Sequence, residues 1–600
     1  MKTRWSIFLA VVFSTISTVW GGYLWNGATS GAYSGTTNWT EDVSLTGKWI
    51  TSGTITFTDN PVIIGNSAID SQLSIEGATV TASASEGLQL ANESYKTADL
   101  YVGAGGQVTV ATVLSTGTVT GSTSNITVEK GGKISAWQAT ISREAGNTTL
   151  KIDGTGSSVT VTGYTALGNR STGTTTAEVL NGGLFQVGYL EGAKSAGTAN
   201  ITVSGEGSLL KAGSTTSSLN GGSLTVTDQA QAIFNGRLYF GRDFEGGTPG
   251  QTKTTIDVEV SEGGLLQAGG FWFGQRENTI NVTISSGGKL YDTGSSHGTM
   301  YVGDHAGSTA VIDIAGGTLQ ADKNINVGQS GNGTIRVSQG GSLTAGQIIV
   351  RAGTGKGLLE IVGKDVSVKT IASSETTGNF TTKGTLHFLA DSTGLGCLEV
   401  GGTYSQSGTV ALGVAGGLTC LSKSVADAEY TLLNAAEGSS AFNITNSSLW
   451  KTTGTNNWTV QLDETKSAGT LSLNTGTLAI TDDYQTAGYL DFTGEGGYFN
   501  LQLSFDGLSD MNATQELVDW MAATYGTENV SALDVGKIQL SSLFSADGTG
   551  ILAWDWSLYN AAETQNISLT GLAGQNVPEP ATWGMLLLGI SFLLRRKRAR

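Results

Sequence analysis

A short glycine-centred pattern recurs through the middle of this 600-residue chain. Each copy has an apolar opening, a Gly/Ser/Thr-rich loop, an alternating apolar and polar stretch, a Gly-Gly turn and a second short stretch. Two clear copies are YVGDHAGSTAVIDIAGGTLQAD from Tyr301 and INVGQSGNGTIRVSQGGSLTAG from Ile325. A repeat of this length indicates a solenoid in which each copy forms one coil. The turns begin at Gly131, Gly182, Gly205, Gly263, Gly287, Gly316 and Gly340, and their closest spacings are about 24 residues.

The alternating stretches, such as AVIDIAGG and ANITVSG, predict β-strands, because successive side chains of a strand point to opposite faces. Val, Ile and Leu can then fill a narrow core while Thr, Ser and Asn face water. The composition agrees, since 88 residues are glycine and 4 are proline, as short strands joined by tight turns require. We therefore predict an all-β chain with a right-handed parallel β-helix in residues 98–375, of about ten to twelve coils.

Residues 22–97 precede the clear repeats and carry several aromatic side chains. Their opening, YLWNGATSGAYSGTTNWT, resembles the start of autotransporter-like passenger repeats, which implies a β-helix. Trp25 and Trp39 are placed to cover the edge that the first coil leaves exposed. We predict an N-terminal cap and the first coils in this segment.

The segments after the repeats are less regular. Residues 376–480 keep the strand character with a looser period and are predicted to form degenerate coils. Residues 481–576 are predicted to form a small C-terminal α+β cap and a linker. The helix of this cap is expected at Ser509–Gly526, which has an N-cap residue, an apolar face and a terminal glycine.

The N-terminal residues 1–21 have the three parts of a secretory signal peptide. Lys2 and Arg4 supply positive charge, residues 5–13 form a short apolar core, and mostly small residues follow. The apolar run is too short to cross a hydrocarbon core of about 30 Å as a helix. We therefore predict that the protein is exported, with a membrane anchor or a core segment as the alternative.

The C-terminal residues 577–600 combine three features in a fixed order. A Val-Pro-Glu-Pro sequence is followed by an apolar stretch at 581–594 and then by a basic end. As a helix the stretch is about 21 Å long, so it can span a membrane when flanking arginines reach the interface. The positive-inside rule keeps the basic end in the cytoplasm. The motif residues are Pro578, Glu579 and Pro580, and the basic anchor is Arg595, Arg596, Lys597 and Arg598.

This tail resembles the PEP-CTERM sorting signal in its VPEP motif, its apolar helix and its terminal RRKRAR. In that family a membrane-embedded cysteine peptidase, the exosortase, reads the tail during export to the cell surface, often alongside exopolysaccharide production. The resemblance implies that Pro578, Glu579 and Pro580 are recognition residues and that an exosortase-like peptidase is a partner. It also implies an inner-membrane-anchored precursor held by its C-terminal helix. A plain tail anchor is the alternative.

The charge balance limits the other partners. The formal net charge is −17, and basic residues are spread thinly except at the C-terminus. Because an acidic surface repels phosphates, we expect no nucleic-acid partner. Exopolysaccharide is the candidate partner for the Thr/Ser/Asn-rich faces of the coils.

Residues that carry catalytic chemistry are few. The histidines are His297, His305 and His387, and Asp304 beside His305 lies in the variable loop of one repeat, where neighbours in sequence do not make a dyad. No P-loop, HExxH, GxSxG or CxxC motif occurs, and the calcium-binding nonapeptide is missing. We therefore expect no enzyme activity and no cofactor or metal site.

The two cysteines do not form a metal motif. Cys397 and Cys420 are 23 residues apart, which is close to one repeat. They can therefore lie on neighbouring coils, within the Cα separation of about 4.4–6.8 Å that a disulfide needs. Two buried thiols are the alternative.

Three functions are compatible with these patterns. The leading expectation is a structural or adhesive surface protein that is processed through its tail. An anchored carbohydrate-active β-helix enzyme is the alternative, and it requires several carboxylates and a basic residue in one groove. A carbohydrate-binding protein is suggested by aromatic side chains that more readily mark the core and coil edges. These are Tyr239, Phe240, Phe271, Trp272 and Phe273.

Overall fold

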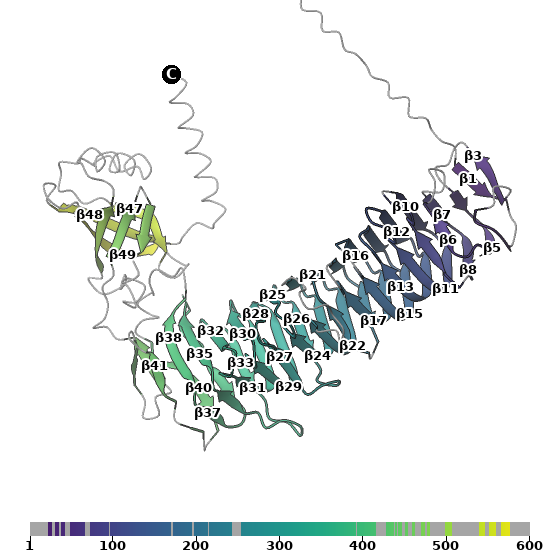
Figure 1. The fold of residues 1–600 in the computed structure, drawn as a ribbon. Coiled ribbons are helices and arrows are strands. Elements are labelled where there is room, and N and C mark those ends of the chain that lie inside the picture. Colours follow the sequence, from purple (N-terminus) through teal and green to yellow (C-terminus); the bar gives the residue numbers. More distant parts are fainter. Residues whose placement is uncertain are drawn as a thin grey trace, which may run out of the picture. The chain divides into compact units, whose positions relative to one another are not determined.

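The fold of this protein is a parallel β-solenoid, as the repeat pattern predicts. A computed structural model describes residues 22–575 with gaps, of which the longest are 243–253, 416–427, 481–498 and 507–538. Every element in the described part of the chain is a β-strand. Two compact units are present, one built on residues up to Thr225 and one from Lys253 onward, with 226–252 divided between them. Figure 1 shows strands of successive coils lying side by side within each unit.

Each full coil has three faces. A strand of the first sheet forms face A, and a glycine turn leads to a strand of the second sheet that bends in the middle. We call its two halves faces B1 and B2, and the point between them the bend. The bend is marked by register shifts between Val110 and Val113 and between Val161 and Tyr164. Long strands therefore turn a corner without a connecting loop.

The strands of the first unit pair in parallel with their counterparts one coil away. Face A contains β1 (Gly22–Trp25), β4 (Lys48–Ile50), β7 (Gln72–Ile75), β10 (Thr97–Val102), β12 (Thr123–Glu129), β14 (Asn147–Asp153), β16 (Thr174–Leu180) and β18 (Thr198–Ser204). Faces B1 and B2 contain β2 (Ser30–Gly31), β5 (Gly53–Phe57), β6 (Val62–Ile64), β8 (Ala78–Ala82), β9 (Leu88–Leu90), β11 (Gln107–Thr116), β13 (Lys133–Ile141), β15 (Ser158–Leu167), β17 (Leu184–Gly192), β19 (Leu209–Ala212) and β20 (Ser217–Leu219).

The second unit repeats this arrangement, and β21 (Gly222–Thr227) and β22 (Gln231–Phe240) are divided between the units. Its face A contains β23 (Thr255–Val260), β25 (Thr279–Ser285), β28 (Thr309–Ala315), β30 (Asn332–Ser338), β32 (Gly357–Val362), β35 (Thr385–Ala390), β38 (Thr409–Val414) and β41 (Ile444–Asn446). Faces B1 and B2 contain β24 (Leu265–Phe273), β26 (Lys289–Asp292), β27 (Thr299–Val302), β29 (Thr318–Val327), β31 (Ser342–Val350), β33 (Ser367–Thr370), β34 (Phe380–Thr382), β36 (Leu398–Val400), β37 (Tyr404–Gln406) and β40 (Leu433–Ala435).

Counted over both units, the described residues make about 14 turns. This exceeds the expected ten to twelve, because regular coils also occur before residue 98 and after residue 375. The step between coils is close to the predicted repeat. Asn281 bonds to Asp257, 24 residues earlier, and Asn125 bonds to Asp99, 26 residues earlier.

Further strands follow the solenoid in sequence. A small sheet contains β39 (Tyr430–Thr431), β42 (Trp450–Thr452) and β43 (Thr459–Leu462). A six-stranded sheet contains β44 (Thr470–Asn474), β45 (Thr477–Ile480), β46 (Phe499–Asp506), β47 (Gln539–Ser545), β48 (Ile551–Tyr559) and β49 (Asn566–Gln575). The helix predicted at Ser509–Gly526 lies outside the described residues.

Inward-facing side chains of successive coils stack into continuous apolar rows. On face A, Ile126 is in register with Leu150, Leu150 with Ala177, and Ala177 with Ile201, and all four are buried. Each β-branched or aliphatic side chain therefore packs against its counterparts one coil above and below. Because one coil cannot bury its own apolar face, stacking supplies the stability of the fold.

The Gly-Gly turns between faces A and B1 use their two glycines differently. The first glycine has a positive φ, +81° at Gly131 and +77° at Gly287, which L side chains rarely adopt. The second glycine packs against the preceding coil, since a Cβ on Gly288 would lie 2.1 Å from the Val260 carbonyl oxygen. All seven turn-opening glycines found in the sequence have a positive φ, which confirms the turn prediction.

An aromatic cluster closes the N-terminal end of the first unit. β1 pairs antiparallel with β3 (Trp39–Asp42), and the Trp25 and Trp39 rings meet edge to face with centroids 5.0 Å apart. Tyr33 packs against Trp39 at 5.7 Å. Lys48 is buried among these rings, with its Nζ 4.0 Å from the Tyr33 ring centroid, a cation–π contact. The hairpin therefore shields the first apolar layer of the core from water.

Candidate functional site

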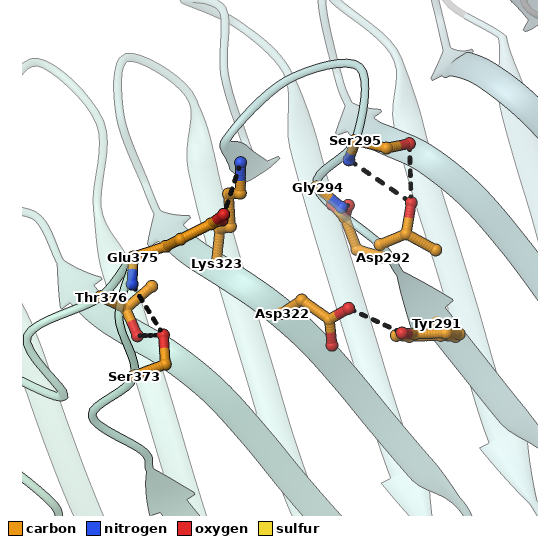
Figure 2. A network of polar contacts seen from close by, with 10 residues as sticks. Tyr291, Asp292, Gly294, Ser295, Asp322, Lys323, Ser373, Glu375 and Thr376 are labelled. Carbon is orange, nitrogen blue, oxygen red and sulfur yellow. Dashed lines mark hydrogen bonds and ion pairs between the residues drawn. The ribbon is translucent and has the colours of Figure 1, made fainter.

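Two inserted loops cover the bend in the second unit. The first, residues 293–298, separates β26 from β27, and the second, residues 371–379, separates β33 from β34. The first loop lies over a glycine, where its Ser296 N–H donates to the Gly269 carbonyl at 2.8 Å. The second loop lies over Gly346, where a Cβ would be 2.4 Å from Thr376. Polar side chains gather around both loops (Figure 2), so this bend is the candidate site of the second unit.

Asp292 holds the base of the first loop. Its side chain is 2% exposed and occupies an inward row, in register with Ala268 and Ala321. The carboxylate accepts hydrogen bonds from the N–H of Gly294 at 2.7 Å and from that of Phe271 at 3.2 Å. Burial raises the pKa of Asp292 to about 6, and the two N–H donors oppose the shift. The residue therefore acts as a buried cap for loop backbone.

Lys323 connects the two loops. Its side chain passes beside Gly294 and Gly298 of the first loop, and its Nζ lies 3.4 Å from Glu375 Oε2 of the second. Figure 2 shows this ion pair between the loops. Beside it, Tyr291 Oη donates to Asp322 at 2.6 Å, and this hydrogen bond raises the pKa of the tyrosine to about 12.

This cluster has the composition that a carbohydrate-active enzyme would need, with three carboxylates and a lysine. Its side chains instead bind loop backbone and one another. Asp292, whose pKa lies near neutrality, is buried against backbone N–H groups and cannot reach a substrate. Glu375 is accessible but is paired with Lys323. The geometry therefore holds two loops in place and does not present an acid and a base to one ligand.

Two of the aromatic side chains noted in the sequence, Tyr239 and Trp272, form a column with Tyr301 and His297 beside the first loop. Trp272 stacks on Tyr239 at 4.8 Å and on Tyr301 at 5.4 Å, and His297 lies over Trp272 at 4.4 Å. In such a column each ring face is occupied by its neighbours, so the faces are not available for a sugar. The five aromatic candidates are all buried, as expected of core and coil-edge residues: Tyr239, Phe240, Phe271, Trp272 and Phe273.

The bend of the first unit runs through unbroken strands in β11, β13, β15 and β17, while short segments separate β5 from β6, β8 from β9 and β19 from β20. Gly163, Gly188 and Gly213 follow one another along it, each against the backbone carbonyl of the preceding coil. The exception is Trp137, which is 55% exposed at the bend of β13. Trp137 was not among the sequence candidates, although it stands where the next coils have glycine.

Two tyrosines border this bare bend on face B2. Tyr164 and Tyr189 are in register, and their ring centroids are 5.1 Å apart. Behind them Lys194 Nζ lies 3.4 Å from the buried Glu191 carboxylate and 5.6 Å from the Tyr164 ring centroid. Burial, followed by the nearby Glu191 charge, raises the pKa of Tyr164. The tyrosine pair is therefore fixed in position and uncharged at neutral pH.

Face A carries a polar ladder in the first unit. Asp99, Asn125, Thr149, Thr176 and Asn200 follow one another in register on its outer side. Asn125 Nδ2 donates to Asp99 Oδ1 at 2.7 Å. Such side-chain bonds between coils satisfy polar groups and strengthen stacking, the sheet equivalent of cross-strand pairs.

Face A of the second unit carries an outward row that is rich in charges. Asp313 is in register with Arg336, Arg336 with Glu360, and Glu360 with His387. His387 Nδ1 lies 3.5 Å from Glu360 Oε1, and its contact lowers the pKa of Glu360. A carboxylate with a lowered pKa is a poor general acid, so this row favours charge pairing between coils over proton transfer.

The remaining histidine, His305, makes its hydrogen-bond contact with backbone and not with the adjacent Asp304. His305 is exposed, and its Nδ1 is 3.0 Å from the Ala306 carbonyl oxygen. Burial raises the pKa of Asp304, opposed by the charges of His305 and His297. Asp304 and His305 are therefore neighbours in a loop, as expected from the sequence. No group of three or more His, Cys, Asp or Glu side chains in the described residues is arranged to hold a metal ion.

Several predicted residues fall outside the described part of the chain. These are the signal peptide 1–21, the sorting motif Pro578, Glu579 and Pro580, the basic residues Arg595, Arg596, Lys597 and Arg598, and Cys420. Cys397 is half-buried, and burial raises the pKa of its thiol to about 11. The disulfide with Cys420 stays a prediction. Within the described residues, no helix has the length and apolar character needed to cross a membrane.

Comparisons with known proteins give no relative from which a function can be transferred. No protein-family model, no curated protein and no solved structure matches this chain. Its function must therefore be argued from its own residues.

Proposed function

We propose that this chain is an exported, surface-anchored structural or adhesive protein that is processed through its C-terminal tail. The observation that carries the proposal is the ladder architecture, in which inward rows are aliphatic and outward rows are hydroxyl, amide and paired charges. Within each unit, coils stacked in this way support one another and present mostly polar outer rows. Exopolysaccharide is the candidate partner of those faces.

The route to the surface follows from the two termini. The signal peptide at 1–21 directs export, and the apolar helix at 581–594 holds the precursor in the inner membrane. An exosortase-like peptidase recognises Pro578, Glu579 and Pro580 and releases the mature protein to the cell surface. The finer features of the fold belong to the same proposal: a right-handed coil, an α+β cap in 481–576 and a transmembrane helix in the tail.

The proposal is tested in a host that has the sorting peptidase. Cells express the full chain with Pro578, Glu579 and Pro580 intact or changed to alanine, and membrane and surface fractions are analysed by mass spectrometry of the C-terminal peptides. We expect the tail to be lost only when the motif is intact. A matched control changes Gln575 and Asn576 to alanine and should be processed normally. An uncut protein in the inner membrane in every case would leave a simple tail anchor.

A further inference from the structure

Trp137 is an unusual residue on the first unit. Among the described large hydrophobic side chains, it and Ile371 are the exposed ones, at 55% and 48%. Trp137 projects at the bend of β13, between Ala136, which is buried, and Gln138. An exposed indole offers a broad apolar face and an N–H donor at little conformational cost, which is why tryptophan is enriched at binding sites.

In the coils that follow Trp137, three glycines at the bend pack closely against the preceding coil. A Cβ on Gly163 would lie 2.8 Å from the Trp137 carbonyl oxygen, and one on Gly188 would lie 2.5 Å from that of Thr162. Gly213 packs in the same way on Gly188, to whose carbonyl its N–H donates at 3.0 Å. We call Trp137, Gly163, Gly188 and Gly213 the bend strip. Trp137 stands at one end of it, and the exposed Thr162 precedes Gly163 at the bend.

Polar and aromatic side chains border the bend strip on both sides. On face B2 lie Tyr164 and Tyr189, described above. On face B1 a row of side chains follows the strip in register, one per coil. The row is Thr109, Ser135, Thr160, Gln186 and Lys211. Its members are separated by about 4.8 Å, the spacing of adjacent strands.

We propose that the bend strip binds a neutral, unbranched polysaccharide that lies along the coils, with Trp137 stacking on one sugar ring. The apolar face of a pyranose ring matches an exposed indole, and its hydroxyls match a row of hydroxyl and amide groups. The row repeats at about the length of one sugar unit in an extended β-1,4-linked chain, so each sugar can lie beside one member of the row. Because Gly163, Gly188 and Gly213 have no side chains, they leave room for a straight chain above them.

The few charges beside the bend strip favour a neutral polysaccharide over an anionic one. The five-residue row contains one ionisable side chain, Lys211, and the chain as a whole has a net charge of −17. A polyanion would therefore be repelled at long range and would find one cation, Lys211, in this row. This inference deepens the proposed function, because it names the site and the class of polysaccharide, but its test does not depend on sorting.

The test uses the full chain purified in mild detergent. Binding is measured by co-sedimentation with microcrystalline cellulose and by affinity electrophoresis in soluble β-1,4-mannan, with alginate as the polyanionic probe. We expect binding to at least one neutral probe and none to alginate. Trp137→Ala should weaken binding on the order of tenfold or more, as loss of a tryptophan anchor does, and Trp137→Phe should restore part of it.

Ile371→Ala is the matched control, since it removes the other exposed hydrophobic side chain, in the second unit. It should bind as the wild type does. Equal binding by Trp137→Ala and wild type, failure to bind either neutral probe, or stronger binding to alginate would each overturn the proposal. The sorting experiment would stand in all of these cases, because tail processing is measured in cells without any added polysaccharide.

Discussion

The bends of the two units occupy the same place in the coil but differ in what lies over their glycines. In the first unit Gly163, Gly188 and Gly213 bring the backbones of successive coils into direct contact. In the second unit the bend is covered by loops 293–298 and 371–379, which Lys323 connects. Gly269 and Gly346 of the second unit also pack on carbonyls of the preceding coil, but there polar side chains of the loops lie over them as well.

This difference indicates where a solenoid can accept change. A coil held by backbone contact has no room for an added side chain at its bend, because its neighbour is a rigid carbonyl. A coil covered by loops has side chains at its bend, and these can move. New side chains should therefore be tolerated better where loops of the second unit cover the bend than at Gly163 and Gly188 of the first unit.

The largest expected effect comes from adding one methyl group to each bend. In Gly188→Ala the new Cβ would lie 2.5 Å from the Thr162 carbonyl oxygen, so the coil must shift, at a cost of roughly 3 kcal/mol or more. In Gly298→Ala the nearest atom is the flexible Lys323 Cδ at 3.4 Å, and the change should stay within about 1 kcal/mol.

Amide hydrogen exchange of the two full-length variants reports the local stability of the strands beside each substituted glycine. We expect faster amide exchange in β15 and β17 for Gly188→Ala and an unchanged pattern in β26 and β27 for Gly298→Ala. Equal losses of protection in both variants would show that the two bends are packed alike.

The solenoid itself could be predicted from the sequence, and the bends could not. The Gly-Gly turns and the period-2 strands are local patterns that repeat, and each recurrence supports the others. Gly163 and Gly188, by contrast, are single glycines whose neighbours are one coil away, and one sequence contains many similar glycines.

Asp292 and Lys323 were missed for a related reason. Asp292 occupies a position that its neighbouring coils fill with Ala268 and Ala321, so a repeat alignment by coil register would have revealed it. Lys323 acts on Glu375, more than one coil away in sequence, through a loop of irregular length. No local pattern reports such a contact.

The second expected effect is a pH dependence confined to the loop-covered bend. Burial raises the pKa of Asp292 from 3.8 to about 6, so the folded chain binds this proton more tightly than the unfolded chain does. Protonated Asp292 therefore stabilises the folded chain, and its contribution to the free energy of unfolding is about 3 kcal/mol. This contribution is fully present below about pH 3.8 and is lost as the pH rises to about 6. Asp292→Asn should remove this dependence while keeping an acceptor for Gly294.

This expectation is checked by urea unfolding, which gives the free energy of unfolding of wild type and variants. The range of about pH 4 to 7 brackets the shift in the pKa of Asp292. The stability of Asp292→Asn relative to wild type should increase as pH rises. Asp292→Ala should lose the same pH dependence and be less stable than Asp292→Asn at every pH by about 1–3 kcal/mol, because two backbone N–H groups then lack their acceptor. A constant difference between wild type and Asp292→Asn would mean that the carboxylate is solvated.

The smallest expected effect concerns the ion pair between the loops. Lys323 and Glu375 are 34% and 68% exposed, so their attraction is screened and should contribute about 0.2–1 kcal/mol. Lys323→Met keeps the aliphatic contact with Gly294 and Gly298 but removes the charge, whereas Lys323→Ala removes both. Limited proteolysis of loop 371–379 should be slightly faster in Lys323→Met, and the difference from wild type should vanish in high salt. If cleavage of the loop is far faster in Lys323→Ala than in Lys323→Met, the aliphatic stem of Lys323 and not its charge holds this bend. The bends of both units would then be secured by close packing, and the units would differ less than their charges suggest.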